Sequence, residues 1–122
     1  MTAPSRTSAL ETVLDYHRAW TSGDVDRAMT RVAEDIVCRA PGQDLVGKDA
    51  YRAFLADFAP SLTGLTDVAS LADDNHVMLF YYPHTATTST APAAEYFTVQ
   101  DGAIVESLLV FDRLSYAPPS KP

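Results

Sequence analysis

Four polar side chains could carry out acid–base chemistry together if the strands that hold them pair as expected. Glu95 lies in one strand-like run, and Tyr82 and His84 end the run before it. Side chains two residues apart share a face of a strand, so a hairpin tip near residue 88 or 89 would place Tyr82 opposite Glu95 and His84 beside it. A helix at the start of the chain would add the phenol of Tyr16. We predict Glu95, Tyr16 and His84 as the catalytic residues, because such groups can move a proton at a ligand oxygen.

Apolar and aromatic side chains are expected around this set, on the inward faces of the same strands and helices. Burial among them would deprive the Glu95 carboxylate of solvation, so the pKa of Glu95 should rise. The lining would suit a small, flat, mostly hydrophobic ligand with one oxygen to hold. The predicted ligand-binding residues are Tyr82, Trp20, Phe54, Phe58, Phe80, Phe97, Phe111 and Met78.

Structural roles compete with the chemical ones. Tyr16 on an amphipathic helix could be a core residue, and His84 at a hairpin end could face solvent. His17 and His76 are expected at outer or terminal positions, and Cys38 is expected to be a buried, unreactive thiol. No His, Asp and Glu residues have the spacing of metal ligands, so we predict neither a metal site nor a cofactor.

Length, charge and cysteine content exclude several classes of protein. The 122 residues suit one domain, and a net charge of −7 without a basic cluster argues against a nucleic-acid partner. A single cysteine excludes a disulfide framework. No apolar run approaches the roughly 20 residues that cross a bilayer, and the first seven residues are polar. We therefore expect a cytoplasmic protein with no membrane partner.

Caps and breakers divide the first half of the chain. A helix at 8–22 should begin at the N-cap Ser8 and end at Gly23, and a second helix with apolar positions at 25–33 should begin at Asp24. A first strand at 36–40, a turn at 41–44 and a helix at 50–59 follow.

Strand-like runs fill the second half, at 65–71, 76–84, 94–99 and 104–111, with a polar hairpin tip at 85–93. Helices followed by antiparallel strands indicate an α+β fold, in which a curved, mixed or antiparallel sheet wraps around three helices as a cone with an internal pocket. The domain should span 8–116, with flexible ends at 1–7 and 117–122.

Several short motifs carry a family resemblance over residues 8–114. They are Tyr16-x3-Trp20-x2-Gly23-Asp24, Asp35-Ile36-Val37, Gly47-Lys48-Asp49-Ala50-Tyr51, and Asp101-Gly102-x-Ile104 with Phe111-Asp112. In order and spacing the chain resembles the SnoaL-like branch of the superfamily of nuclear transport factor 2, ketosteroid isomerase and limonene-epoxide hydrolase. The resemblance implies their α+β barrel.

The resemblance transfers only part of a known active site. In the isomerase, two groups donate hydrogen bonds to a ligand oxygen. The resemblance implies that their positions fall on Tyr16 and Glu95 of this chain, with Glu95 as a neutral acid. The general base of the isomerase falls on Ala40, which cannot accept a proton. The acid–arginine–acid set of the hydrolase falls on Glu95, Ala93 and Leu109, so two of its three groups are missing.

Three functions therefore stay open. The chain could be a cofactor-free isomerase, polyketide cyclase or lyase that acts on a hydrophobic carbonyl compound, or a binding module without catalysis. It could also be a scaffold that dimerises through the sheet face. A homodimer is expected in all three cases because Tyr81, Tyr96, Leu108 and Val110 are predicted to point outward.

Overall fold

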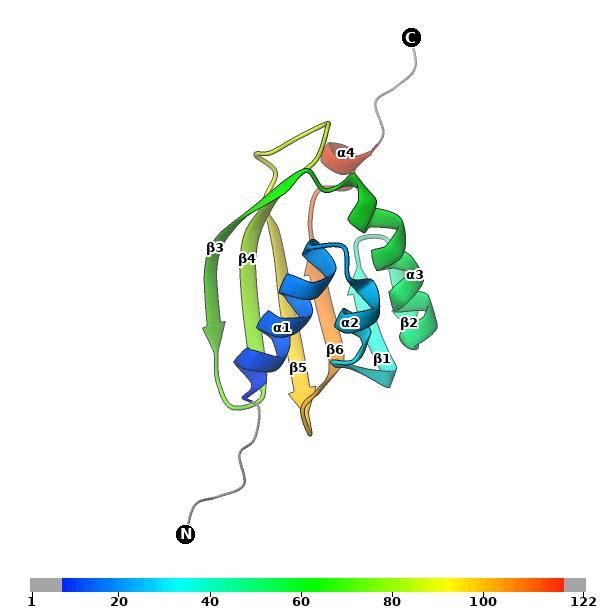
Figure 1. Ribbon diagram of the computed structural model, residues 1–122, viewed down its shortest axis with the longest axis vertical. Helices are drawn as coiled ribbons and strands as arrows, with labels where there is room; N and C mark the ends of the chain where they lie inside the picture. The colour runs from blue at the N-terminus through cyan, green and yellow to red at the C-terminus, as the bar shows by residue number, and fades with distance from the viewer. Residues whose placement is uncertain (1–7, 118–122) are drawn as a thin grey trace.

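The computed structural model describes residues 8–117 and forms a bent six-stranded sheet with helices on one face (Figure 1). The strand order is β2-β1-β6-β5-β4-β3, and every neighbouring pair is antiparallel except β1 and β6. The expected α+β fold with a mixed sheet is confirmed. The expected flexible ends, apart from Ala117, lie outside the described residues.

Side-chain caps begin both N-terminal helices as predicted. Helix α1 (Ala9–Thr21) begins where Ser8 Oγ accepts a hydrogen bond from the Glu11 amide at 3.0 Å. Gly23, with φ +94°, follows that helix. Helix α2 (Val25–Met29) begins where Asp24 Oδ1 accepts from the Arg27 amide at 3.1 Å.

The second helix is shorter than predicted, because its last apolar positions belong to a strand. Strand β1 (Val32–Ala40) starts four residues before the expected position. Val32 pairs with Ile104 of β6, and the Ile104 amide donates to the Arg31 carbonyl at 2.8 Å. A partner strand distant in the sequence therefore overrides the local helical pattern.

A short strand, β2 (Gln43–Val46), begins in the second half of the segment expected to be a turn. The turn itself needs only Pro41 and Gly42, with Gly42 at φ +77°. Helix α3 (Lys48–Phe58) then begins directly after Gly47, and the helical turn η1 (Ala59–Ser61) follows it at the predicted proline stop.

The four C-terminal strands are confirmed with ends shifted by at most one residue. They are β3 (Gly64–Ala72), β4 (His76–His84), β5 (Ala93–Gln100) and β6 (Ala103–Val110). A four-residue helix that the sequence analysis did not predict, α4 (Arg113–Tyr116), follows β6.

The predicted register between β4 and β5 is wrong, and the error reverses one face of β4. Leu79, not Tyr82, lies opposite Glu95. The two positions are three residues apart, and an odd shift turns each side chain to the other face. The reason is an asymmetric loop: pairing with β5 stops at Tyr81 and Ala93, whereas β4 continues to His84 against β3 alone.

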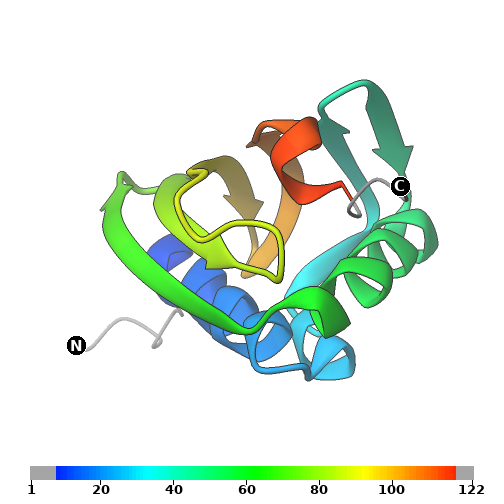
Figure 2. The same ribbon diagram turned by 90° about the horizontal axis from the view of Figure 1, so that it is seen from above.

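The core lies between the bent sheet and helices α1 and α3, as Figure 2 shows from above. Tyr16 and Tyr51 reach it from the two helices, and Phe97 of β5 meets the Tyr16 ring edge-on at 5.7 Å between ring centres. Covering one face of the sheet in this way leaves the ends of the strands as the route into the interior.

The other face of the sheet carries apolar side chains that no element of residues 8–117 covers. Met78, Tyr96 and Leu108 are consecutive partners across three strands and are 46%, 41% and 47% exposed. Val110 is exposed as predicted, but Tyr81 points inward. The homodimer expected through this face stays a prediction.

Within residues 8–117, no helix is both long and apolar enough to span a membrane.

We expect Gly47→Ala to destabilise the protein by about 1–3 kcal/mol, because Gly47 has φ +91° and ψ +157°, a conformation that only glycine adopts without strain. A Cβ at this position would approach only the Glu34 carbonyl oxygen, at 4.0 Å, so the loss would come from the backbone and not from a clash. Urea unfolding measures this loss in the free energy of unfolding. Thr63→Ala, at an exposed position, is the control and should change stability by less than about 0.5 kcal/mol. Equal stability of the two variants would contradict this account of the α3 start.

Candidate functional site

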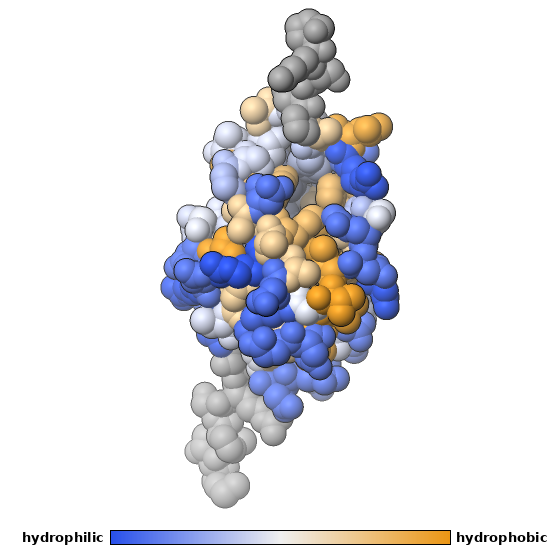
Figure 3. Space-filling model, turned by 90° about the vertical axis from the view of Figure 1, so that its right-hand side faces the viewer, coloured by the Kyte–Doolittle hydropathy of each residue, from blue (hydrophilic) through white to orange (hydrophobic). Residues whose placement is uncertain are grey.

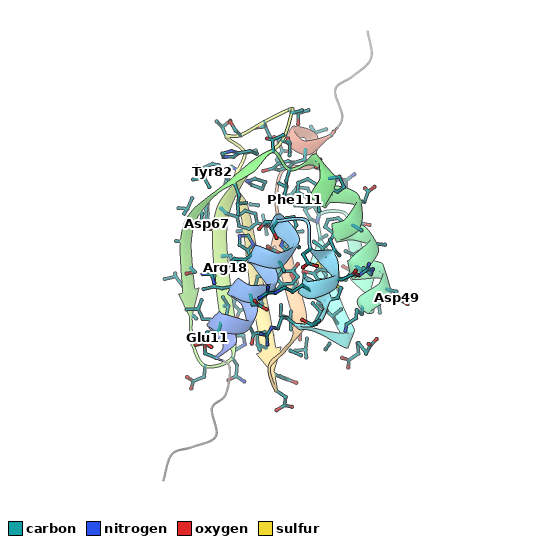
Figure 4. The ribbon with its side chains drawn as sticks, viewed as in Figure 1. Glu11, Arg18, Asp49, Asp67, Tyr82 and Phe111 are labelled. Atoms are coloured by element: carbon teal, nitrogen blue, oxygen red, sulfur yellow. The ribbon has the colours of Figure 1, made fainter. Side chains whose placement is uncertain are left out.

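A cavity of about 40 Å³ lies between the sheet, α1 and α3, with α4 beside it. This space holds roughly two or three water molecules. Figure 4 shows Phe111, one of its lining residues, close to α4 and between the sheet and α3. The lining is almost wholly apolar and consists of Trp20, Phe54, Leu55, Phe58, Tyr81, Pro83, Ala93, Glu95, Leu109, Phe111 and Tyr116.

Glu95 is the only acidic residue of that lining and is 3% exposed. It points inward from near the start of β5, as the interpretation of Glu95 as a site residue requires. Its Oε2 accepts a hydrogen bond from the Tyr81 hydroxyl at 2.8 Å. Among residues 8–117, its second oxygen has no hydrogen-bond partner, so that oxygen is free for a ligand.

Burial raises the pKa of Glu95 from the ordinary value of 4.5 to about 7, and the hydrogen bond from Tyr81 opposes this rise. The expected direction is confirmed. A carboxyl group with this pKa exists in both protonation states near neutral pH. It can therefore accept or donate a proton there.

Tyr81 of β4, and not Tyr82, is the phenol beside Glu95. Behind it lies His17 of α1, whose ring meets the Tyr81 ring edge-on at 4.7 Å between centres. His17 Nε2 is 3.0 Å from Oδ1 of Asp67 on β3, and burial lowers the pKa of His17. The sequence analysis placed His17 on an outer position, and this is wrong: the residue is buried because the β3 edge covers that side of α1.

Tyr16 is buried as predicted, but it does not line the cavity. Its hydroxyl is hydrogen-bonded to the Tyr51 hydroxyl of α3, and the two rings stack. Burial, together with the neighbouring phenol, raises the pKa of Tyr16 well above its ordinary value. Ser107 Oγ lies near the Tyr51 hydroxyl and the Cys38 thiol but, among the described residues, has hydrogen-bonding geometry with neither.

Four predicted site residues of β4 do not point into the cavity, because the register of β4 against β5 is shifted by three residues. They are Met78, Phe80, Tyr82 and His84. The outer-face position of Met78 and Phe80 makes both more than 40% exposed. His84 is hydrogen-bonded to Thr66 at 2.9 Å and is not a lining residue, and Tyr82 lies toward β3 in Figure 4. Phe97 is buried in the core but is not a lining residue. The predictions for Trp20, Phe54, Phe58 and Phe111 as lining residues agree with the structure.

The sequence contained a signal for some of the residues that were missed. Tyr51 shares a helical face with Leu55, a cavity residue, at the spacing i, i+4. Tyr81 could not be distinguished from Tyr82 by alternation, because both faces of β4 are apolar. No signal identified Tyr116, since α4 was not predicted.

Neither a metal centre nor a reactive thiol is evident in the described part of the chain. No group of three or more His, Cys, Asp or Glu side chains in residues 8–117 could hold a metal ion. Burial raises the pKa of the Cys38 thiol to about 12, so it stays protonated at neutral pH. Proton transfer by Glu95 is the chemistry that this arrangement supports.

Figure 3 views the side of the molecule that carries α3 and β2, where hydrophobic side chains lie in the middle of the face between hydrophilic ones. Val46 of β2 is among the exposed apolar residues of the protein, with 70% of its surface accessible. Val46 is not a lining residue of the cavity beside Glu95, and the candidate site therefore remains the cavity.

Comparison with known proteins gives both a family and a fold. The family model "SnoaL-like domain" matches residues 13–107. A crystal structure of a protein from Kribbella flavida DSM 17836 is 44% identical, covers 90% of this chain and 91% of that chain, and has a TM-score of 0.86. No functionally curated protein matches the chain.

Two more distant structures share the fold alone. A proposed SnoaL-like polyketide cyclase from Jannaschia sp. CCS1 is 19% identical, with a TM-score of 0.75 over 98% of this chain and 99% of that chain. TerC, co-crystallised with polyporic acid, is 18% identical, with a TM-score of 0.74 over 88% of this chain and 94% of that chain.

We expect Glu95→Gln to stabilise the protein at high pH but not at low pH. The native state holds the Glu95 proton up to a pH of about 7, whereas the unfolded chain releases it near 4.5. Wild-type stability should fall as the pH rises between these values, by about 3 kcal/mol in total, and stay low above them. Gln cannot ionise, so the variant should lack this loss. Urea unfolding of wild type and Glu95→Gln from pH 4 to 8 tests this difference in pH dependence. Glu106→Gln is the control, because Glu106 is an exposed glutamate. Parallel pH profiles of wild type and Glu95→Gln would contradict a buried acid.

We expect Tyr81→Phe to raise the pKa of Glu95 further, because the Tyr81 hydrogen bond favours the charged carboxylate. A carbon-13 NMR titration of the Glu95 carboxyl carbon measures this value directly. Tyr82→Phe is the matched control, since it removes the neighbouring hydroxyl from the other face of β4. A shift in Tyr82→Phe and none in Tyr81→Phe would mean that the two tyrosines have been assigned to the wrong faces.

Proposed function

The chain belongs to the SnoaL-like domain family, and we propose that it binds a small hydrophobic carbonyl compound in the cavity and transfers a proton with Glu95. The reaction would be an isomerisation, cyclisation or dehydration that needs no cofactor. The observation that carries the proposal is one carboxyl group, with a pKa of about 7, on the wall of an otherwise apolar cavity.

The environment of Glu95 suits a base that removes a proton from carbon next to a carbonyl group. An apolar lining lets a hydrophobic substrate displace the water and leaves the carboxylate poorly solvated, which increases its basicity. Tyr81 holds Oε2, so the free oxygen has a fixed direction toward the ligand. The protonated acid can then return the proton at another carbon, which completes an isomerisation.

The ligand class follows from the lining residues. Aromatic rings of Trp20, Phe54, Phe58 and Phe111 offer flat apolar surfaces, while Glu95 and Tyr81 are the polar contacts near one side. The Trp20 Nε1–H is buried without a partner among residues 8–117. A ligand in the cavity would therefore contact the indole ring of Trp20 and not this N–H group.

Distant relatives provide limited support for the reaction class. Proposed polyketide cyclases occur among the structures with the same fold, and TerC was crystallised with an organic acid. One fold hosts many activities, so the argument rests on the Glu95 environment and not on these names.

A binding module without catalysis is the second candidate, and one observation favours it. The Tyr16 hydroxyl bonds to Tyr51 and does not reach the cavity lining, so the donor that the family resemblance implied for a ligand oxygen is occupied. Ala40, at the position of the isomerase base, offers no replacement. In that case the same ligand would bind and leave unchanged.

Deuterium exchange at carbon separates the two candidates, with 2-tetralone in D₂O as the probe ligand. We expect the wild-type protein to accelerate exchange of the α-protons of 2-tetralone for deuterium. Proton NMR measures the rate of this exchange. Glu95→Gln should lower the rate about a hundredfold or more, because a general base contributes this much. The wild-type rate should rise with pH through about 7 and then level off, as Glu95 ionises.

Tyr82→Phe is the control and should exchange at the wild-type rate, since Tyr82 is not a lining residue. Saturable binding of 2-tetralone without exchange would favour the binding module. Exchange that survives in Glu95→Gln would refute the role of Glu95.

A further inference from the structure

Helix α4 contributes a single side chain to the cavity wall, that of Tyr116. The Tyr116 ring meets Phe58 of α3 edge-on at 5.9 Å and Phe111 at 5.5 Å between ring centres. All three rings line the cavity. Together they form an aromatic wall. Figures 1 and 2 show that α4 and the 85–92 loop lie at the same end of the sheet.

The part of this wall that α4 forms is held more weakly than the parts of the lining that α1 and α3 form. Helix α4 has four residues, none of which is buried, and its Leu114 is 86% exposed. The opposite walls come from α1 and α3, where Trp20 and Leu55 are buried. An element with little buried apolar surface opens at a small free-energy cost, so α4 is the wall most readily displaced.

Two hydrogen bonds fasten α4 to the loop that joins β4 and β5. The Tyr116 hydroxyl donates to the Ala91 carbonyl. The Thr87 hydroxyl donates to the Ser115 carbonyl at 2.8 Å. Both contacts are at or near the surface, and water can replace them when the helix moves.

The size of the cavity makes such movement necessary for a ligand larger than a few atoms. Its 40 Å³ is smaller than an aromatic ring requires, and the remaining lining side chains are packed against the core. The Tyr116 ring fills space that a second ring of a ligand would otherwise occupy.

We propose that Tyr116 is the residue that sets the size of ligand accepted beside Glu95, and that α4 with the 85–92 loop is the wall that moves to admit it. This inference rests on the proposed function, because it concerns ligands of the same cavity. It predicts that truncation of Tyr116 favours larger ring systems over smaller ones.

Phenol and 2-naphthol are suitable probes, because they differ by one ring and carry one oxygen. Calorimetry gives their affinities, and stopped-flow fluorescence of Trp20, the only tryptophan, gives association rates. We expect Tyr116→Ala to bind 2-naphthol about tenfold more tightly than wild type, with a change of less than about threefold for phenol. Tyr116→Phe and Thr87→Ala keep the ring but loosen α4, so both should speed association of 2-naphthol and leave the selectivity unchanged.

Tyr96→Ala is the matched control, since it removes a tyrosine ring from the uncovered face of the sheet and should alter neither measurement. A circular dichroism melt of each variant verifies that it is folded. Equal affinities of wild type and Tyr116→Ala for 2-naphthol, with binding intact, would overturn the role of Tyr116 and leave the proposed function standing. Absence of binding of either phenol to both proteins would overturn both. Should Tyr116→Ala fail to fold, unchanged association rates in Thr87→Ala and Tyr116→Phe would still refute the moving wall.

Discussion

The hydrogen bond between Tyr81 and Glu95 is the interaction on which the site depends. A carboxyl group buried among aromatic rings loses most of its solvation, and this loss is tolerated only where a partner compensates for it. Tyr81 offers that partner from the next strand, with its ring held by His17. One donor is too little to keep the acid fully ionised at neutral pH, and the pKa of about 7 results from this incomplete compensation.

The bent sheet explains why one acid can be isolated in this way. Helices α1 and α3 cover the inward face, so polar groups there must satisfy one another, and the Tyr16–Tyr51 pair does so away from the cavity. Only near the ends of the strands does the packing leave space, and there the wall is the small helix α4. The cavity borders the core and shares Trp20, Leu55, Tyr81 and Ala93 with it.

Membership of the SnoaL-like family fixes the fold but not the chemistry. The resemblance to ketosteroid isomerase implies that the position of its general base falls on Ala40, which cannot accept a proton. If Glu95 acts as the base, the reactive proton must lie on a different side of the ligand from the one that the resemblance implies. The same scaffold would then carry out related chemistry from a different wall of the cavity.

The sequence by itself determined the caps at Ser8 and Asp24 and the four C-terminal strands, because these depend on neighbours within a few residues. The inward direction of Glu95 was a hypothesis, and the burial of its side chain agrees with it. Tertiary structure alone decided which tyrosine of β4 meets Glu95. Both faces of β4 are apolar, so alternation fits either register, and the asymmetric loop selects one of them. It also decided that Val32 joins a strand and that Tyr116 reaches the cavity, since both depend on partners far away in the chain.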